Sequence, residues 1–174
     1  GQDIHVTWAV APVAPGVGTP TGNVKVSYAG SEASIACSAP VATGGCTLFG
    51  EHAGTISLSA TYDGDANFSS SSAGVQHTVD KADTQVTITA DTPEGAPAGE
   101  LVHVAYSIMA VEPGAGVITG TVTVSDGVDS CVGTTLDGGC NLALTTPGTR
   151  TLTATYGGSA DFNGSSDTES HLVG

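Results

Sequence analysis

Apolar and small polar residues alternate along much of this chain. Within 151–156, Leu152, Ala154 and Tyr156 share one face of an extended segment, and three threonines share the other. A period of two is typical of a strand with one buried and one solvated face, so the pattern predicts antiparallel sheets. The same alternation predicts strands at 4–10, 23–28, 57–62, 84–90, 102–109, 121–125 and 142–144. No segment has the longer period of an amphipathic helix.

This pattern occurs twice. Residues 37–79 and 131–173 agree at 18 of 43 positions without gaps, a shift of 94 positions. About seven short strands per repeat, separated by Gly- and Pro-rich turns, favour a sandwich of two antiparallel sheets of the immunoglobulin type. The sequence therefore predicts an all-β protein made of two tandem immunoglobulin-like β-sandwiches, at 1–80 and 83–174.

The first repeat is shorter at its start. His5 aligns with His103, which places residue 1 opposite Gly99 and leaves the strand-like segment 84–90 without a counterpart. We expect the first sandwich to lack its first strand. Either the sequence is a cut from a longer array or has a disordered end, or a strand of another chain completes the sheet by β-augmentation.

Several motifs resemble a known repeat family. They are TGTVTVSDG at 119–127, the second cysteine pair, GTRTLTATY at 148–156 and Phe162, with PTG at 20–22 and YDGDANF at 62–68 in the first repeat. Together they resemble the group-three bacterial immunoglobulin-like domains over nearly the whole chain. The resemblance implies arrays on bacterial surface, adhesion and secreted proteins, where such domains serve as spacers or binding modules. The turn at 157–161 departs from it, because it lacks the two aspartates of 63–65.

The chain is strongly acidic, with 17 Asp and Glu against 3 Lys and Arg and a net charge of −14. Nucleic-acid binding needs basic residues that neutralise phosphates, so the composition excludes it. Anionic membrane surfaces are excluded for the same reason. No run of 18 apolar residues predicts a membrane span. The acidity fits solubility through self-repulsion, and the alternative is binding of divalent cations.

Four cysteines form two pairs of equal spacing. Cys37 and Cys46 are separated by eight residues, as are Cys131 and Cys140, and each interval contains Gly-Gly. The spacing differs from that of zinc sites. A Gly-Gly turn brings the two arms of a hairpin within reach of a disulfide. We therefore predict Cys37–Cys46 and Cys131–Cys140 disulfides and an oxidising, extracellular compartment.

One turn carries candidate metal ligands. Asp63, Asp65 and Asn67 alternate around Gly64, and oxygen ligands at this spacing resemble the start of a calcium loop. The bidentate Glu of such a loop is missing, and the alternative is an acidic turn whose side chains cap backbone groups. Calcium is the one cofactor that the sequence suggests. Three further aspartates are expected to be solvated: Asp126, Asp129 and Asp137.

Other chemistry is weakly indicated. Asn67-Phe68-Ser69 and Asn163-Gly164-Ser165 match the N-glycosylation pattern, although Asn and Ser are frequent in turns by chance. The chain has no nucleophile elbow and no phosphate-binding glycine loop followed by Lys. A catalytic site needs converging polar groups, and the sequence does not assemble one.

These patterns favour a non-catalytic module. We expect an extracellular structural or adhesion repeat on the bacterial cell surface, acting as a stalk, an adhesin shaft or a filament subunit. Its partners would be neighbouring repeats of the same chain or other subunits, by strand complementation. The alternative is a polysaccharide-binding module of a surface or secreted protein. That alternative predicts exposed aromatic residues, and Phe49 is the one expected outside.

Overall fold

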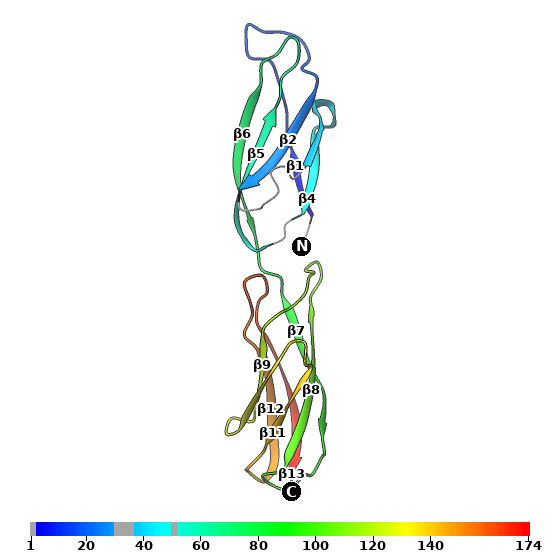
Figure 1. The fold of residues 1–174 in the computed structure, drawn as a ribbon, viewed down its shortest axis with the longest axis vertical. Helices are drawn as coiled ribbons and strands as arrows, with labels where there is room; N and C mark the ends of the chain where they lie inside the picture. Colours follow the sequence, from blue (N-terminus) through cyan, green and yellow to red (C-terminus); the bar gives the residue numbers. More distant parts are fainter. Residues whose placement is uncertain (1–2, 30–36, 50–51) are drawn as a thin grey trace. The chain divides into compact units, whose positions relative to one another are not determined.

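In the computed structural model, which describes residues 3–29, 37–49 and 52–174, the chain is all-β. The described residues form 13 strands and one short 3-10 turn at Val41–Thr43, with no α-helix among them. The chain divides into two compact units, unit 1 at Gly1–Asp80 and unit 2 at Lys81–Gly174 (Figure 1). Over the described ranges, no helix is long and apolar enough to cross a membrane.

Unit 1 contains two antiparallel sheets. The strand order is β3-β2-β5-β6 in one sheet and β1-β4 in the other. The strands are β1 (Asp3–Thr7), β2 (Asn23–Ala29), β3 (Cys37–Pro40), β4 (Gly45–Phe49), β5 (Gly54–Tyr62) and β6 (Ser71–Val79). The longest pairing joins β5 to β6, from Gly54 opposite Val79 to Tyr62 opposite Ser71.

Unit 2 repeats this arrangement with one more strand. Its sheets have the orders β10-β9-β12-β13 and β11-β8-β7. The strands are β7 (Thr84–Thr92), β8 (Leu101–Ala110), β9 (Thr121–Ser125), β10 (Ser130–Thr134), β11 (Gly139–Ala143), β12 (Gly148–Tyr156) and β13 (Ser165–Val173). The four-stranded sheets of the two units therefore have corresponding strands in corresponding places, and β1 and β4 correspond to β8 and β11.

The alternation seen in the sequence becomes a core between the two sheets. In unit 2, Val122, Val124 and Leu152 of the four-stranded sheet are fully buried, and Val104 of the three-stranded sheet is fully buried as well. These residues belong to one cluster that draws on both sheets. Burial of such side chains stabilises a fold by roughly 1.5–3 kcal/mol each relative to exposure, so this shared core holds the two sheets together.

The two units differ at the edge of the smaller sheet. β8 pairs with β11 on one side and with β7 on the other, whereas β1 pairs with β4 alone among the described strands. The register of β6 places Val75 opposite Leu58, on the face that carries the core. Leu58 is buried, yet Val75 is 62% exposed. The core of unit 1 is accordingly smaller, with its main buried cluster formed by Ile4, Val26, Leu48 and Leu58.

The observed strands differ from the sequence prediction in two ways. The strand expected at 4–10 ends at Thr7, although the Trp8 N–H still donates to the Gly44 carbonyl oxygen at 2.9 Å. β6 and β13 were not predicted from alternation. The first six positions of β6 are all exposed, so no buried face imposes a period of two on this edge strand.

Candidate functional site

Both predicted disulfides are present, with S–S distances of 1.96 Å for Cys37–Cys46 and 2.03 Å for Cys131–Cys140. The expected hairpin geometry is wrong, however. β3 belongs to the four-stranded sheet and β4 pairs with β1, so the first disulfide joins the two sheets of unit 1. The second does the same in unit 2, between β10 and β11. At the Gly-Gly segment the chain passes from one sheet to the other. Each disulfide therefore joins the two sheets of its unit.

The Asp65 carboxylate, a predicted calcium ligand, accepts four hydrogen bonds from the chain. Oδ2 accepts the backbone N–H and the hydroxyl of Thr21 at 2.8 and 2.7 Å. Oδ1 accepts the backbone N–H groups of Asn67 and Phe68 at 2.8 and 2.9 Å. These hydrogen bonds hold the pKa of Asp65 well below its usual range, and the bond from the Thr21 hydroxyl contributes most to this lowering. The carboxylate thus fixes the turn after β5 to the segment before β2.

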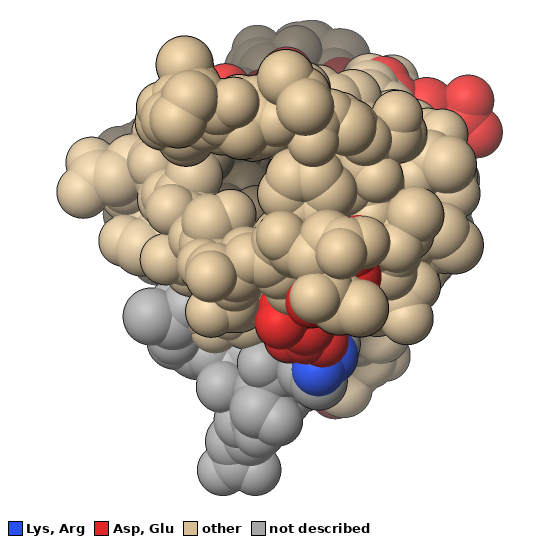
Figure 2. Space-filling view, turned by 90° about the horizontal axis from the view of Figure 1, so that it is seen from above, with Lys and Arg blue, Asp and Glu red and all other residues tan. Residues whose placement is uncertain are grey.

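The other two predicted calcium ligands have different roles. Asp63 Oδ2 lies 2.7 Å from Lys25 Nζ, and both side chains are 45% exposed. Figure 2 shows basic atoms lying directly against acidic ones on the face in view. Asn67 is exposed and contributes its backbone N–H to Asp65. The arrangement favours the capping interpretation of this turn, and calcium binding at Asp63, Asp65 and Asn67 stays a prediction.

The two candidate glycosylation sites are both exposed, at Asn67 and Asn163. Nδ2 of Asn163, the atom that glycosylation would modify, donates to Oδ1 of Asp83 at 2.8 Å and approaches the Lys81 carbonyl oxygen at 3.5 Å. Modification there would compete with the bond to Asp83.

Asp126 was expected to be solvated, and this is wrong. Its side chain has no exposed surface, and Oδ2 accepts a hydrogen bond from Nε of Arg150 at 2.7 Å. Burial alone would raise the pKa of Asp126, but N–H donors of Asp129 and Val128, together with Arg150, lower it. Arg150 is 24 positions away, so spacing gave no signal for this ion pair. Asp129 is half-buried and Asp137 is exposed.

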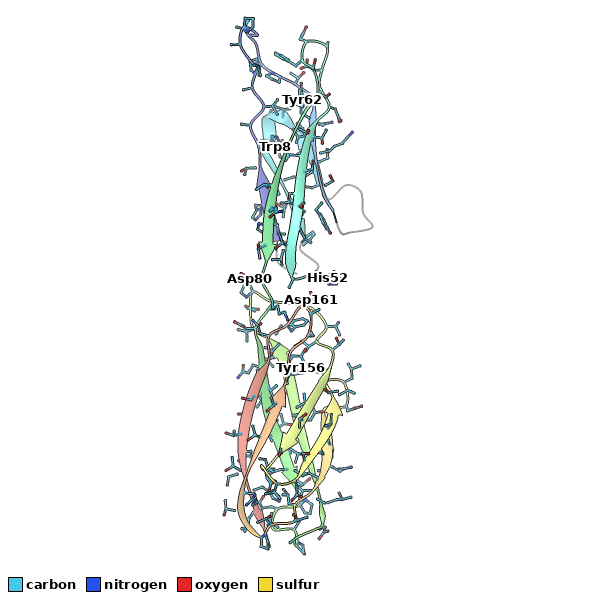
Figure 3. All side chains as sticks on the ribbon, turned by 90° about the vertical axis from the view of Figure 1, so that its left-hand side faces the viewer. Trp8, His52, Tyr62, Asp80, Tyr156 and Asp161 are labelled. Atoms are coloured by element: carbon cyan, nitrogen blue, oxygen red, sulfur yellow. A yellow bond between two sulfur atoms is a disulfide. The ribbon has the colours of Figure 1, made fainter. Side chains whose placement is uncertain are left out.

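Tyr62 and Tyr156, both labelled in Figure 3, end the corresponding strands β5 and β12. The two residues differ in hydrogen bonding. The Tyr156 hydroxyl donates to the Thr119 carbonyl oxygen at 2.9 Å. The Tyr62 hydroxyl is buried beside the Asp65 carboxylate and the Thr21 backbone but makes no hydrogen bond of normal geometry within the described part of the chain. Burial, and then the nearby negative charge of Asp65, raise the pKa of Tyr62. The same position therefore has a well-formed hydrogen bond in unit 2 and none in unit 1.

Three potential metal ligands gather in unit 2, and sequence reasoning missed them. Asp91 lies near the end of β7, Glu94 in the turn that follows, and His171 in β13. One ligand atom from each lies within 4.8 Å of the others. Nδ1 of His171 is 2.7 Å from Oδ2 of Asp91 and 3.2 Å from Oε2 of Glu94. Asp91 and His171 are 80 positions apart, so only the recurrence of His77 as His171 singled out one member.

An open depression of about 580 Å³ lies on the sheet that contains β2, β5 and β6. In the strand register, Ser59 is opposite both Ser27 and Gly74, and these three alternate with core residues. The side chains of Ser27 and Ser59 therefore share the face that points away from the core. Ser57 and Gln76 also line the depression, together with Tyr28, Leu58 and Val75 of the alternate positions, and most of the exposed lining is apolar. Hydroxyl and amide groups on an open face can hydrogen-bond a polar ligand.

Comparisons with protein-family models, with curated proteins and with solved structures gave no match. The two units therefore serve as references for each other. They share the order of the four-stranded sheet and a disulfide with a sequence separation of 9 residues between the sheets.

Proposed function

We propose that this chain is a non-catalytic structural or adhesion module, made of two tandem immunoglobulin-like sandwiches and exposed on a bacterial surface or secreted. The repetition carries this proposal, because both units have the same four-stranded order and a disulfide at the same place. Disulfides persist in oxidising compartments, which supports an extracellular location. Repeated domains give length and spacing, which suits a stalk, an adhesin shaft or a filament subunit.

A mechanical role is tested by stretching single molecules of the full chain. We expect two unfolding events, each lengthened by roughly 30 Å after reduction, since about nine residues per disulfide loop extend by 3.3–3.6 Å each. The reduced chain is the control. Unfolding at negligible force, without a redox-dependent step, would contradict a mechanical role.

Antibodies against the chain should label intact cells of the source organism, and labelling only after permeabilisation would contradict the surface location.

The depression on unit 1 favours a second candidate, a polysaccharide-binding module. Its volume falls in the range of small-ligand sites, and its lining combines serine hydroxyls with the Tyr28 ring and apolar side chains, a combination that can bind a sugar. Ser59→Trp fills the depression and should abolish binding on a glycan array. Thr153→Trp, at the matching position of unit 2, should leave binding unchanged. The absence of any glycan binding by the unaltered chain would remove this candidate.

The edge of β1 supports a proposal about how separate subunits join. In unit 2, β7 pairs with β8 and also contacts side chains of β13. The Thr84 hydroxyl lies 2.8 Å from that of Ser165, and the Ile88 N–H donates to Asp167 at 2.8 Å. β7 is therefore held on both sides, by backbone pairing with β8 and by polar side chains of β13.

Unit 1 offers the edge of β1 and the hydroxyl of Ser71 without a described strand between them, but Ala73 stands where Asp167 accepts the Ile88 N–H in unit 2. β1 has β4 as its one described partner, and Ser71 and Ala73 of β6, which correspond to Ser165 and Asp167, are exposed. We propose that a strand of a neighbouring subunit, with the alternating pattern of β7, adds to β1 by β-augmentation.

A synthetic peptide with the sequence of β7 tests this partner. Trp8 is the one tryptophan of the chain and packs against the core of unit 1, so its fluorescence reports this unit. The peptide should raise the unfolding midpoint of unit 1. A control peptide in which Val86 and Ile88 are replaced by Lys should not. Equal effects of the two peptides, or none, would contradict strand addition.

A further inference from the structure

The cluster of Asp91, Glu94 and His171 has an unbalanced charge. Two carboxylates approach one imidazole nitrogen, at 2.7 and 3.2 Å. The chain has only 3 Lys and Arg residues in total. These basic side chains bind elsewhere: Lys25 pairs with Asp63, Arg150 with Asp126, and Lys81 donates to the Ser159 carbonyl oxygen. A cation at the cluster would supply the positive charge that these side chains do not.

The imidazole of His171 is buried and directed at the two carboxylates. Its side chain has no exposed surface. Nε2 is buried and has no partner in the described part of the chain, so every polar contact of the ring is at Nδ1. Arg150 is its neighbour across β12 and β13, but the guanidinium is directed at Asp126.

The backbone around the cluster is already ordered. Oε1 of Glu94 accepts the Leu172 N–H at 3.0 Å, which leaves Oε2 as the oxygen nearest the imidazole. The Gly95 N–H donates to the Leu172 carbonyl oxygen at 3.0 Å, and the Gly174 N–H donates to that of Ala96 at 2.9 Å. These bonds join the turn after β7 to the end of β13, so the ligands are brought together before a metal binds.

We propose that Asp91, Glu94 and His171 form a site for a divalent transition-metal ion of the Zn²⁺ class. Imidazole combined with carboxylate oxygens suits such ions, and three protein ligands leave a fourth position for water. Ligand atoms about 2.0–2.2 Å from a tetrahedral Zn²⁺ lie roughly 3.3 Å apart. The separation between His171 and Glu94, 3.2 Å, is close to this value, whereas the 2.7 Å between His171 and Asp91 would have to widen by roughly 0.6 Å on binding. Glu94 is 58% exposed, which leaves room for a bound water.

Such an ion would tie β7 and its following turn to β13. Because it binds only the folded arrangement, it would stabilise unit 2 by mass action. Unit 1 provides an internal reference, since His77 corresponds to His171 but the strand and turn that carry Asp91 and Glu94 have no counterpart among its described residues. The site is independent of the proposed structural or adhesion role.

Calorimetric titration of the EDTA-treated full chain with ZnCl₂ tests the proposal. We expect one Zn²⁺ per chain and a higher unfolding temperature for unit 2, with the Trp8 fluorescence transition of unit 1 unchanged. Glu94→Gln keeps the shape of an exposed side chain but removes a ligand charge. It should weaken binding by at least the roughly 10- to 100-fold loss that follows removal of an outer-shell partner.

Glu100→Gln is the matched control, because Glu100 is exposed in the same unit and is not part of the cluster. It should leave the affinity unchanged. The imidazole NMR signals of His171 should shift at one equivalent of Zn²⁺, a readout that does not depend on any variant. Equal affinities of the Glu94→Gln and Glu100→Gln chains, unshifted His171 signals, or no stoichiometric binding would overturn the proposal.

Discussion

Arg150 and Asp126 form an ion pair inside unit 2, with Nε of Arg150 2.7 Å from Oδ2 of Asp126. The Asp126 side chain has no exposed surface and that of Arg150 keeps 22%. A second hydrogen bond runs from Nη2 of Arg150 to the Asp126 carbonyl oxygen at 3.3 Å. The pair fixes the turn after β9 to the start of β12.

Removing the arginine should destabilise unit 2 strongly. Arg150→Met leaves the Asp126 carboxylate buried without its counter-ion, and we expect a loss of about 3 kcal/mol, the lower end of the range for buried pairs. Lys25→Met is the control, because the Lys25–Asp63 pair is 45% exposed on both sides and exposed pairs contribute roughly 0.2–1 kcal/mol. Calorimetric unfolding of the full chain measures both, and equal losses would contradict this account.

The disulfides should be detectable by mass and by stability. Intact mass without reductant should be about four hydrogens below that of the reduced chain, two per bond. Replacing Cys131 and Cys140 by Ser should destabilise unit 2 by about 3 kcal/mol, from the entropy of closing a short loop in the unfolded chain. Free thiols in the native protein, or peptides that link Cys37 to Cys131 or Cys140, would contradict the pairing.

The two matching tyrosines should respond differently to loss of the hydroxyl. Tyr156→Phe removes the hydrogen bond to the Thr119 carbonyl and should cost about 0.5–1.5 kcal/mol. Tyr62→Phe removes a buried hydroxyl that makes no hydrogen bond of normal geometry in the described part of the chain, so unit 1 should keep or gain stability. Calorimetry of the full chain measures the stability of both variants, and Trp8 fluorescence identifies the transition of unit 1. A larger loss for Tyr62→Phe than for Tyr156→Phe would contradict the assignment.

Acid should destabilise both units through aspartates with lowered pKa. Hydrogen-bond donors hold the pKa of Asp65 in unit 1, and of Asp126 and Asp137 in unit 2, below the usual range of an aspartate. Their contribution is therefore complete above the unfolded pKa of about 3.9 and is lost as the pH falls further, through the folded pKa.

Asp65→Asn tests the acid response of unit 1. It should lower stability at pH 7, since the charged acceptor of four hydrogen bonds is lost, and it should flatten the fall in stability below about pH 4. Asp63→Asn, which removes only an exposed ion pair, is the control. Urea unfolding followed by Trp8 fluorescence measures both, and an unchanged acid slope in Asp65→Asn would assign the effect to other groups.

Local patterns determined much of the fold. Alternation placed the strands around Val122 and Leu152, because a strand with one buried face needs an apolar residue at every second position. Comparison of the two repeats showed that the cysteines are equally spaced, and this spacing was enough to predict the correct disulfide pairs. Edge strands such as β6 gave no such signal, because their side chains are exposed on both faces.

Tertiary structure decided what the local patterns left open. Cys37 and Cys46 were expected in one hairpin, but they lie in different sheets, because the reversal between them crosses from one layer to the other. Asp126 is buried only because Arg150, 24 positions away, is brought to it across β9 and β12. Asp91 and His171 meet across 80 positions because β7 lies beside β13. Strand register and sheet packing set these contacts, and neither is encoded in the spacing of residues along the chain.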